Sequence, residues 1–357
     1  MLRLIEGGLS SVAYENIKEE IKKLTNLGKR VFLLVPEQQA VIAERDIMDT
    51  LPPSASLTFE VTNFTRLANT VYRNLGGLAG EYSTKAKEAL IMWKTLSELS
   101  PFLKMTSGSE INTGMVEKAL AAVSELKSIS ATPDELSAIA ENECIKKDGR
   151  LSSKLADITK IMSLYTKLLE EKYTSASDEC ARLGAKLKEN TEFLSNAYFF
   201  ISGFTSFTEP QYTVIGELIK RCTVSVHLAL SKRNYEAFEF SEIIKTKSRL
   251  ISIADKASAE KRIERYDTPI QAKNPLLVEA CDLLWRSFAR ADANSVIENR
   301  DALRIFEAKD PYDECDFIAA DIKRRVMAGA SYSDFAIIAR DAKKYDGILD
   351  ASLDNAE

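Results

Sequence analysis

The sequence contains one histidine, His227, and only five cysteines among its 357 residues. No two cysteines form a C-x-x-C pair, which argues against a cysteine-based metal site and predicts reduced thiols in a cytoplasmic protein. His227 lies in the run Val-Ser-Val-His-Leu-Ala-Leu, which is typical of a strand. We therefore interpret it as a packed strand residue rather than as a catalytic base.

Long apolar runs and an excess of positive charge are also missing. No run approaches the roughly 18 residues that span a bilayer, and no basic, apolar leader precedes the first predicted strand, so we expect neither a membrane span nor secretion. The formal net charge of −5 argues against a general polyanion binder. The length and the 45% of hydrophobic residues predict a soluble protein of about two domains.

A glycine pair follows the first predicted strand. Residues 2–5 are predicted to form a short buried strand, and residues 14–24 an amphipathic helix. Residues 7–11 (Gly-Gly-Leu-Ser-Ser) connect them as a turn of small residues. A strand, a small-residue loop and a helix form the layout of a phosphate-binding loop, in which backbone N–H groups and the helix N-terminus bind an anion.

The chemistry of such a loop is incomplete here. When G-x-x-x-x-G-K-[ST] is aligned on Gly7, Ala13 stands in place of the lysine and Tyr14 in place of the hydroxyl residue that binds magnesium. The alternative is an ordinary strand–helix turn in which a serine caps the helix. The candidates for a degenerate nucleotide-binding loop are Gly7, Gly8, Ser10 and Ser11.

Further short apolar runs alternate with predicted helices. Near-continuous apolar strands separated by helices predict a doubly wound α/β domain with a parallel sheet. The predicted strands are residues 31–35, 57–61, 197–202, 224–230 and 335–339, with 303–307 as a further candidate.

A long helical stretch interrupts this alternation. From about residue 84 to 195 no strand is predicted, and helix starts are well marked, as in the capping box Thr132-Pro133-Asp134-Glu135. Residues 275–290 predict a connecting helix to a second sheet domain that begins near residue 300. Because two or three strands do not close a core, we expect the chain to be the N-terminal part of a longer protein.

Four segments carry a resemblance to a known family. They are residues 34–38 (Leu-Val-Pro-Glu-Gln) with Glu44, residues 61–68 (Val-Thr-Asn-Phe-Thr-Arg-Leu-Ala), residues 200–208 (Phe-Ile-Ser-Gly-Phe-Thr-Ser-Phe-Thr), and residues 312–315 and 332–341. In this order and spacing, the chain resembles the N-terminal region of the AddB/RexB family, the second subunit of the bacterial AddAB-type ATP-dependent helicase/deoxyribonuclease. The resemblance covers the whole chain.

The resemblance implies a superfamily 1 helicase-like, P-loop NTPase-like fold. Residues 1–83 and 196–270 would form helicase domain 1A, residues 84–195 a helical insert like domain 1B, and residues 271–357 a connecting helix with the beginning of domain 2A. The implied function is the repair of DNA double-strand breaks by homologous recombination. An AddA-type helicase–nuclease subunit is the implied partner, in a cytoplasmic heterodimer that acts on single-stranded DNA or duplex ends.

The departures from the family pattern matter as much. The family commonly carries a loop that ends in Gly-Lys-[Ser/Thr], and an Asp where Ser202 stands here. Losing the charge clamp and the metal carboxylate removes the groups that stabilise a transferring phosphoryl group. We therefore expect that this region neither hydrolyses nor tightly binds ATP and holds no cofactor. Magnesium, a 4Fe–4S cluster and the nuclease carboxylates are implied only for the rest of the full-length family member.

Loops at the carboxyl ends of the second and third strands are the candidate DNA contacts. In a helicase core such loops touch one DNA strand, and here they offer amides, hydroxyls, a cation and an aromatic ring. The alternative is that Thr62 or Asn63 caps a helix and Phe64 is a core residue. The candidates are Gln38, Gln39, Thr62, Asn63, Phe64 and Arg66.

Two other functional classes remain open at this stage. One is a stand-alone nucleotide-dependent enzyme such as a small kinase, against which the missing lysine argues. The other is a scaffold that docks the partner helicase subunit without touching DNA, which the acidic net charge favours. We expect no catalytic residue in this region.

Overall fold

The computed structural model describes residues 1–8, 11–52, 55, 57–77, 81–104, 110–142, 145, 148–170, 173–174, 176–190, 193–231, 235, 237–266, 277 and 302–356. The chain divides into two compact units, and residues 302–356 belong to the second. Within the described ranges, no helix has the length and apolar character needed to cross a lipid bilayer.

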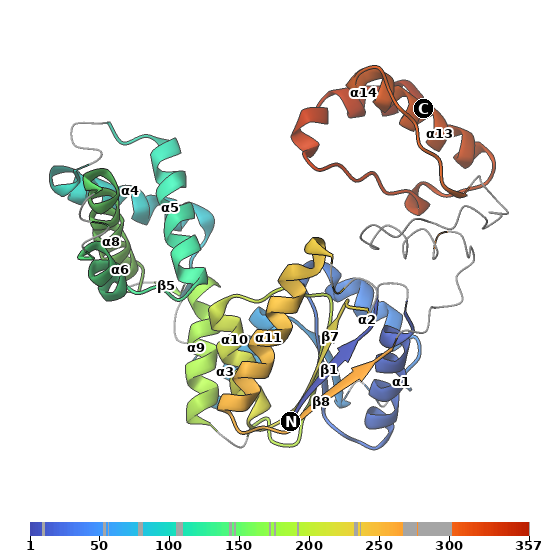
Figure 1. Ribbon diagram of the computed structural model, residues 1–357, viewed down its shortest axis with the longest axis horizontal. Coiled ribbons are helices and arrows are strands. Elements are labelled where there is room, and N and C mark those ends of the chain that lie inside the picture. Colours follow the sequence, from blue (N-terminus) through green and yellow to red (C-terminus); the bar gives the residue numbers. More distant parts are fainter. Residues whose placement is uncertain are drawn as a thin grey trace. The chain divides into compact units, whose positions relative to one another are not determined.

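A six-stranded sheet with parallel pairing throughout forms the centre of the first unit (Figure 1). Its order is β3-β2-β6-β7-β1-β8, so β7 separates β6 from β1. Parallel neighbours require crossover connections, and this sheet with its helices confirms the predicted α/β class. The strands are β1 (Leu2–Glu6), β2 (Val31–Leu34), β3 (Phe59–Thr62), β6 (Tyr198–Ile201), β7 (Thr223–Leu228) and β8 (Lys261–Arg265).

The central strands are apolar on both faces, as their sequences predict. Leu33 and Leu34 point to opposite sides of β2, and both are fully buried. Phe32 pairs in register with Phe199 of β6, and the two rings stack with centroids 4.7 Å apart. The edge strand β8 differs, because its Lys-Arg-Ile-Glu-Arg sequence is largely exposed. No strand was predicted there, since a charged edge strand has no apolar run.

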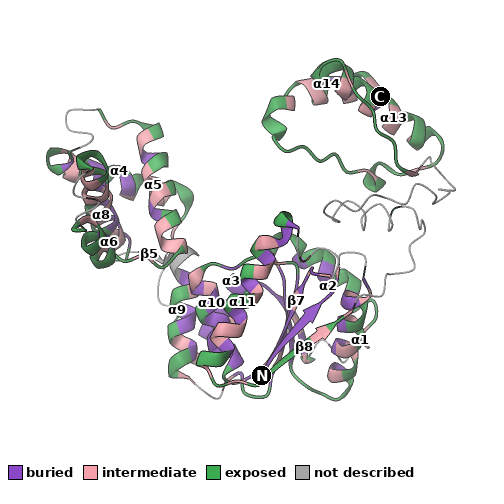
Figure 2. Ribbon diagram, viewed as in Figure 1, coloured by how far each residue is buried: buried purple, intermediate pink, exposed green. Residues whose placement is uncertain are grey.

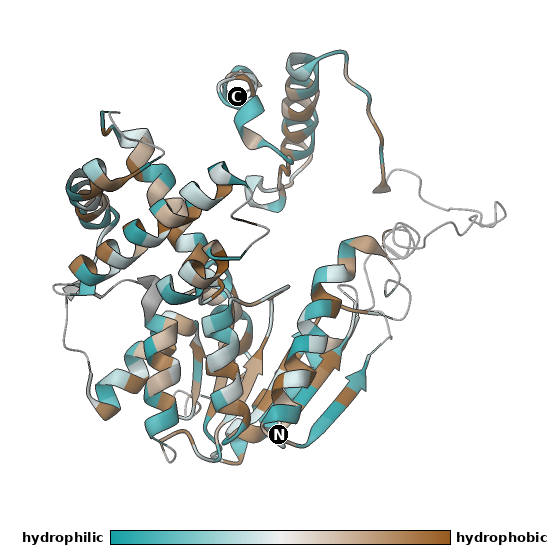
Figure 3. Cartoon of the chain, turned by 60° about the vertical axis from the view of Figure 1, so that its left-hand side comes forward, coloured by the Kyte–Doolittle hydropathy of each residue, from teal (hydrophilic) through white to brown (hydrophobic). Residues whose placement is uncertain are grey.

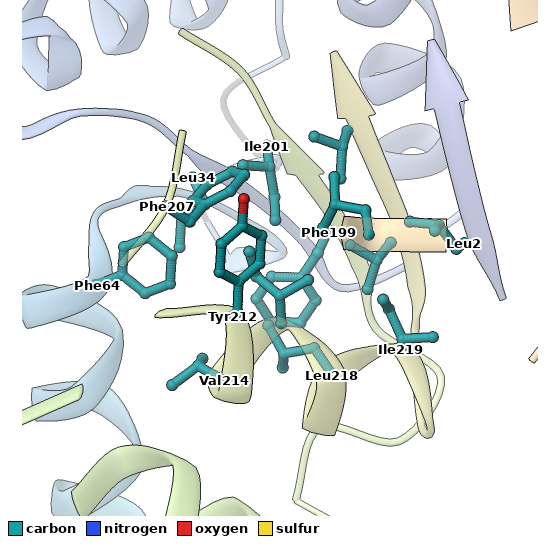
Figure 4. Close-up of a cluster of buried hydrophobic side chains, with 14 of the residues drawn as sticks. Leu2, Leu34, Phe64, Phe199, Ile201, Phe207, Tyr212, Val214, Leu218 and Ile219 are labelled. Carbon is teal, nitrogen blue, oxygen red and sulfur yellow. The ribbon is translucent and has the colours of Figure 1, made fainter. Parts of the chain in front are cut away.

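Helices cover both faces of the sheet (Figures 1 and 2). The larger core lies between one face and α3, α9, α10 and α11, and Figure 4 shows Leu2, Leu34 and Ile201 from the strands facing side chains of α10. The smaller core lies between the other face and α1 and α2. These helices are α1 (Ala13–Asn26), α2 (Ala40–Met48), α3 (Phe64–Leu75), α9 (Ala176–Glu189), α10 (Glu209–Ile219) and α11 (Ser241–Lys256).

A helical excursion leaves the sheet between two short paired strands, β4 (Glu81–Tyr82) and β5 (Tyr173–Thr174). It has its own core, which includes Met92, Leu136 and Tyr165, and hydrophilic residues cover much of the helix surfaces (Figure 3). The predicted capping box is present, with Thr132 and Glu135 bonded reciprocally. The excursion contains α4 (Lys85–Leu99), η3 (Ser100–Phe102), α5 (Thr113–Ser128), α6 (Pro133–Ala140) and α8 (Gly149–Glu170).

Helix α9 lies inside the predicted insert of residues 84–195 but packs with the sheet. Leu183 and Leu187 of α9 are buried in the larger core, alongside α3 and α10. The boundaries of the insert stay a prediction, and this helix argues for a shorter excursion.

The second unit corrects two strand predictions. Residues 303–307 and 335–339 form no strand, and Ile305 and Ile338 are 95% and 92% exposed. Within residues 302–356 neither segment has a neighbour to pair with, and an apolar run alone does not make a sheet. The predicted connecting helix at 275–290 lies outside the described residues apart from residue 277. The helices are α13 (Pro311–Met327), η6 (Tyr332–Asp334), η7 (Ala342–Tyr345) and α14 (Ile348–Ala356).

Candidate functional site

The loop after β1 is closed by its own residues. The Gly7 N–H donates to the carbonyl of Leu228 on β7 at 3.2 Å, and the Ser11 N–H donates to the carbonyl of Gly8 at 2.9 Å. A Cβ on Gly7 would overlap Ser11 Oγ and Ala13 Cβ. Glycine is therefore required at residue 7, because the beginning of α1 folds directly back onto it.

Ser11 lies just before Val12, the N-cap residue of α1, and bonds to the first residue of the helix. Its Oγ accepts a hydrogen bond from the Ala13 N–H at 3.3 Å, and the residue is buried. The Ser11 hydroxyl oxygen therefore already has a partner at the start of α1. Ser10, the other candidate serine, lies outside the described residues.

Three side chains meet between α1 and the ends of β6 and β7. The Tyr14 ring stacks on the His227 ring with centroids 6.4 Å apart, and Ser202 Oγ lies 3.0 Å from His227 Nδ1. Burial lowers the pKa of His227, and the Gly7 backbone acts more weakly in the opposite direction. The imidazole is therefore neutral at pH 7.

Glu6, the last residue of β1, neutralises two nearby cations. Its carboxylate is 2% exposed and lies 2.5 Å from Lys247 Nζ and 2.8 Å from Arg265 Nε. Burial raises the pKa of Glu6, but the hydrogen bonds from Lys247 and Arg265 outweigh it and leave the pKa below its ordinary value. The Tyr235 hydroxyl also donates to Glu6, at 3.4 Å. Lys247 therefore serves a buried ion pair rather than an incoming phosphate.

The residues at the end of β1 do not fit an ATP–magnesium complex. Ala13 supplies a methyl group against Gly7 where a lysine would bind the terminal phosphates. Tyr14 packs on His227 where a hydroxyl would bind magnesium, and Ser202 bonds to the same His227 where a carboxylate would stand. Neither a charge clamp nor a metal ligand is formed by these three residues.

The candidates at the ends of β2 and β3 divide into exposed and buried residues. Gln38 and Gln39 are exposed in η1 (Glu37–Gln39), and Arg66 is exposed in the first turn of α3. Thr62 is fully buried, and Asn63 caps α3 by accepting the Arg66 N–H on Oδ1 at 2.8 Å. The structure therefore leaves two amides and one guanidinium accessible from this group.

The aromatic ring predicted to offer a stacking face is a core residue, which is a correction. Phe64 is only 6% exposed, because its ring packs edge-on against Phe204 at 5.9 Å and against Phe207 at 6.4 Å. The partly exposed ring of the cluster is Phe204, in the loop after β6. The sequence carried a signal for it, an aromatic residue directly after Gly203 at the end of a buried strand.

Gly203 joins the ends of β2 and β6. Its φ of +84° suits glycine, and a Cβ there would overlap the side-chain amide of Gln39. The Gln39 amide therefore lies against Gly203, the second residue after β6. The carboxyl ends of adjacent parallel strands are the usual place for a binding site in an α/β sheet.

Comparison with known proteins decides the family. Residues 6–278 match the family described as ADDB, N-terminal. The chain belongs to this family. It is 30% identical to the second (B) subunit of the ATP-dependent helicase/deoxyribonuclease of Caldanaerobacter subterraneus subsp. tengcongensis, over 98% of this chain and 30% of the relative. It is 28% identical to the protein of that name from Thermoanaerobacter sp. (strain X514), over 92% of this chain and 29% of the relative.

The chain spans about 30% of the length of the curated relatives it matches. Among its described residues, no group of three or more His, Cys, Asp or Glu side chains is arranged to hold a metal ion. Burial raises the pKa of the Cys180 thiol to about 11 and that of Cys222 to about 12, so both are protonated at pH 7 and suited to packing.

Proposed function

We propose that this AddB N-terminal region binds single-stranded DNA along the carboxyl edge of its sheet and does not hydrolyse ATP. The observation that carries the proposal is the set of three exposed residues, Arg66, Gln38 and Gln39, and the partly exposed Phe204, which follow the ends of β3, β2 and β6. A guanidinium and amides suit phosphate and base edges, and a half-exposed ring suits stacking. The relatives' name, helicase/deoxyribonuclease, supports DNA as the ligand.

The finer description of the fold is part of this proposal. A strand inserted between β1 and β6, together with a helical excursion after β3, supports a superfamily 1 helicase-like core with a 1B-like insert. The side chains around Gly7 support a core in which the nucleotide site has been lost. In this proposal the sheet keeps the helicase architecture while its DNA-facing edge keeps the function.

The role of the whole protein extends the proposal to the family level. We assign the full-length protein to DNA double-strand break repair by homologous recombination, in a cytoplasmic heterodimer with an AddA-type helicase–nuclease subunit. The relatives are named as one lettered subunit of an enzyme, which supports a partner subunit. Magnesium and a 4Fe–4S cluster would belong to the rest of the full-length protein.

Fluorescence anisotropy with fluorescein-labelled oligothymidylate at several salt concentrations tests the DNA proposal. We expect binding that weakens steeply with salt, because a contact to phosphate releases counterions. Arg66→Ala is expected to weaken binding and to reduce the slope of log K against log salt by about 1. Absence of binding at low salt would refute the proposal.

Isothermal titration with Mg-ATP tests the nucleotide half. We expect no binding below millimolar concentration, because the loop lacks the lysine and the metal ligands of a phosphate-binding loop. Sub-millimolar binding, or phosphate release above background, would contradict this half and revive a nucleotide-dependent enzyme.

A scaffold without DNA contact is the second candidate. The net charge of −5 favours it, since an acidic surface repels a polyanion. If the chain captures the partner helicase subunit and binds no oligothymidylate at low salt, the scaffold is supported.

A further inference from the structure

One aromatic side chain near the carboxyl edge of the sheet, in the turn before α11, is almost fully exposed to solvent. Phe238 is 86% exposed and opens η4 (Phe238–Phe240), the short turn that leads from β7 into α11. Its neighbours Ala237 and Phe240 are buried, and the Phe240 N–H donates to the Ala237 carbonyl at 3.1 Å. The exposed ring therefore lies in a short turn between two buried residues.

Helix α11 carries this turn beyond the ends of the strands. Lys247 of α11 reaches Glu6, the last residue of β1. Ser241 begins the helix six residues earlier, which corresponds to about 9 Å along the axis. Figure 1 shows the upper end of α11 extending past the arrowheads of β1 and β8. The η4 turn that carries Phe238 therefore lies at the carboxyl edge of the sheet.

A buried hydrogen bond ties α11 to the loop after β6. Thr246 is 1% exposed, and its hydroxyl donates to the carbonyl of Thr205 at 2.9 Å. Thr205 is adjacent to Phe204 in the loop that forms part of the proposed DNA-binding edge. Phe238 precedes Thr246 by eight residues, about 13 Å along the 3-10 turn and the first part of α11.

We infer that Phe238 is a stacking platform for a base of the single strand that crosses this edge. The inference rests on the proposed function and adds the β7–α11 turn to the ends of β3, β2 and β6. Glu239 and Glu242, one and four residues after Phe238 in the chain, are exposed. Because these carboxylates repel phosphates, the strand presents a base and not its backbone to this position.

The experiment compares three variants of the full chain by anisotropy with labelled oligothymidylate over a series of salt concentrations. Phe238→Ala removes the ring, Phe238→Trp keeps an aromatic face, and Leu57→Ala removes an 89% exposed apolar side chain at the opposite end of β3. An oligothymidylate that carries 2-aminopurine at successive positions reports stacking directly, through its fluorescence.

Stacking predicts a specific pattern. Phe238→Ala is expected to weaken binding about tenfold, and Phe238→Trp to restore it, while the salt slope stays that of the unaltered protein. The stacking signal is expected to disappear at one 2-aminopurine position in Phe238→Ala. Leu57→Ala is expected to bind as the unaltered chain does.

Three outcomes would overturn the inference. Equal binding of Phe238→Ala and the unaltered chain, with Arg66→Ala still impaired, refutes the platform and leaves the DNA proposal intact. A reduced salt slope in Phe238→Ala shows that the variant disturbs phosphate contacts instead. Failure of the unaltered chain to bind oligothymidylate refutes the platform and the DNA proposal together.

Discussion

The end of β1 and the ends of β2 and β6 belong to the same edge of one sheet. The side chains after β1 pack against the protein, whereas those after β2 and β6 are accessible to solvent. After β1, Ser11, Ala13 and Tyr14 turn back onto the loop and onto His227. After β2 and β6, Gln38 and Phe204 remain accessible. The same strand–loop–helix layout therefore gives a closed end after β1 and an open end after β2 and β6. The function of each end depends on its side chains and not on the fold.

The two ends also differ in how their charges are satisfied. At the closed end, Lys247 and Arg265 are both paired with the buried Glu6. At the open end, the Arg66 side chain is exposed in the first turn of α3. The cap of this helix is the Asn63 side chain, which accepts the Arg66 N–H. Substitutions at the closed end should therefore act on stability, and those at the open end on binding.

The largest effect is expected from Glu6→Gln. Removing one partner of a buried ion pair leaves Lys247 without its countercharge, at a cost of about 3 kcal/mol in the free energy of unfolding. Urea denaturation followed by circular dichroism measures this difference. Glu209→Gln is the matched control, because its pair with Arg249 is largely exposed and is expected to contribute below about 1 kcal/mol. Equal losses in the two variants would contradict a closed, charge-paired end of β1.

Gly7→Ala is expected to come next. The added Cβ would overlap Ser11 Oγ and Ala13 Cβ, and such overpacking typically costs about 1–3 kcal/mol of unfolding free energy. The neighbouring Gly8→Ala is the control, since a Cβ there would meet Ser231 at an ordinary 3.6 Å. A thermal melt should show a clear loss for Gly7→Ala alone. Similar melting temperatures for both variants would show that the loop has room to open.

The strands of the sheet differ in how well the sequence predicts them. The five strands β1, β2, β3, β6 and β7 were predictable, because burial on both faces leaves an apolar run such as Val31–Leu34. The charged edge strand β8 left no such run. The segments at 303–307 and 335–339 have apolar runs without pairing partners in the described residues, so the same signal predicted strands wrongly.

The candidate site was predictable by position rather than by side chain. Strand-end loops identified Gln38, Gln39 and Arg66, which are exposed. The same argument selected Phe64, whose ring is buried by contacts with Phe204 and Phe207 that lie more than a hundred residues away in sequence. Which ring of an aromatic cluster faces solvent depends on such long-range packing, and no local pattern carries it.

Asn63→Ala sharpens the comparison within the open end. Losing the cap of α3 is expected to lower the free energy of unfolding by about 1 kcal/mol, while Asn63→Asp keeps an acceptor for the Arg66 N–H. Urea denaturation measures the loss, and anisotropy with oligothymidylate is expected to stay within about twofold of the unaltered chain for both variants. A large loss of affinity in the stable Asn63→Asp variant would assign Asn63 to DNA contact.

The smallest effect is a pH dependence at the closed end. Burial holds the pKa of His227 below its ordinary value, whereas in the unfolded chain it titrates near 6.5. As the pH falls below about 6.5, the unfolded chain takes up a proton that the folded chain does not, so stability falls until the lower folded pKa is reached. The loss is below about 1.4 kcal/mol per pH unit.

His227→Gln removes this titration. Because His227 is the one histidine in the sequence, the difference in unfolding free energy between the two proteins isolates it. We expect that difference to be constant from pH 8 to about 7. Toward pH 5.5 the free energy of unfolding of the unaltered protein should fall relative to that of His227→Gln. Parallel curves over this range would mean that the imidazole is open to solvent, and the end of β1 would then be no more closed than the ends of β2 and β6.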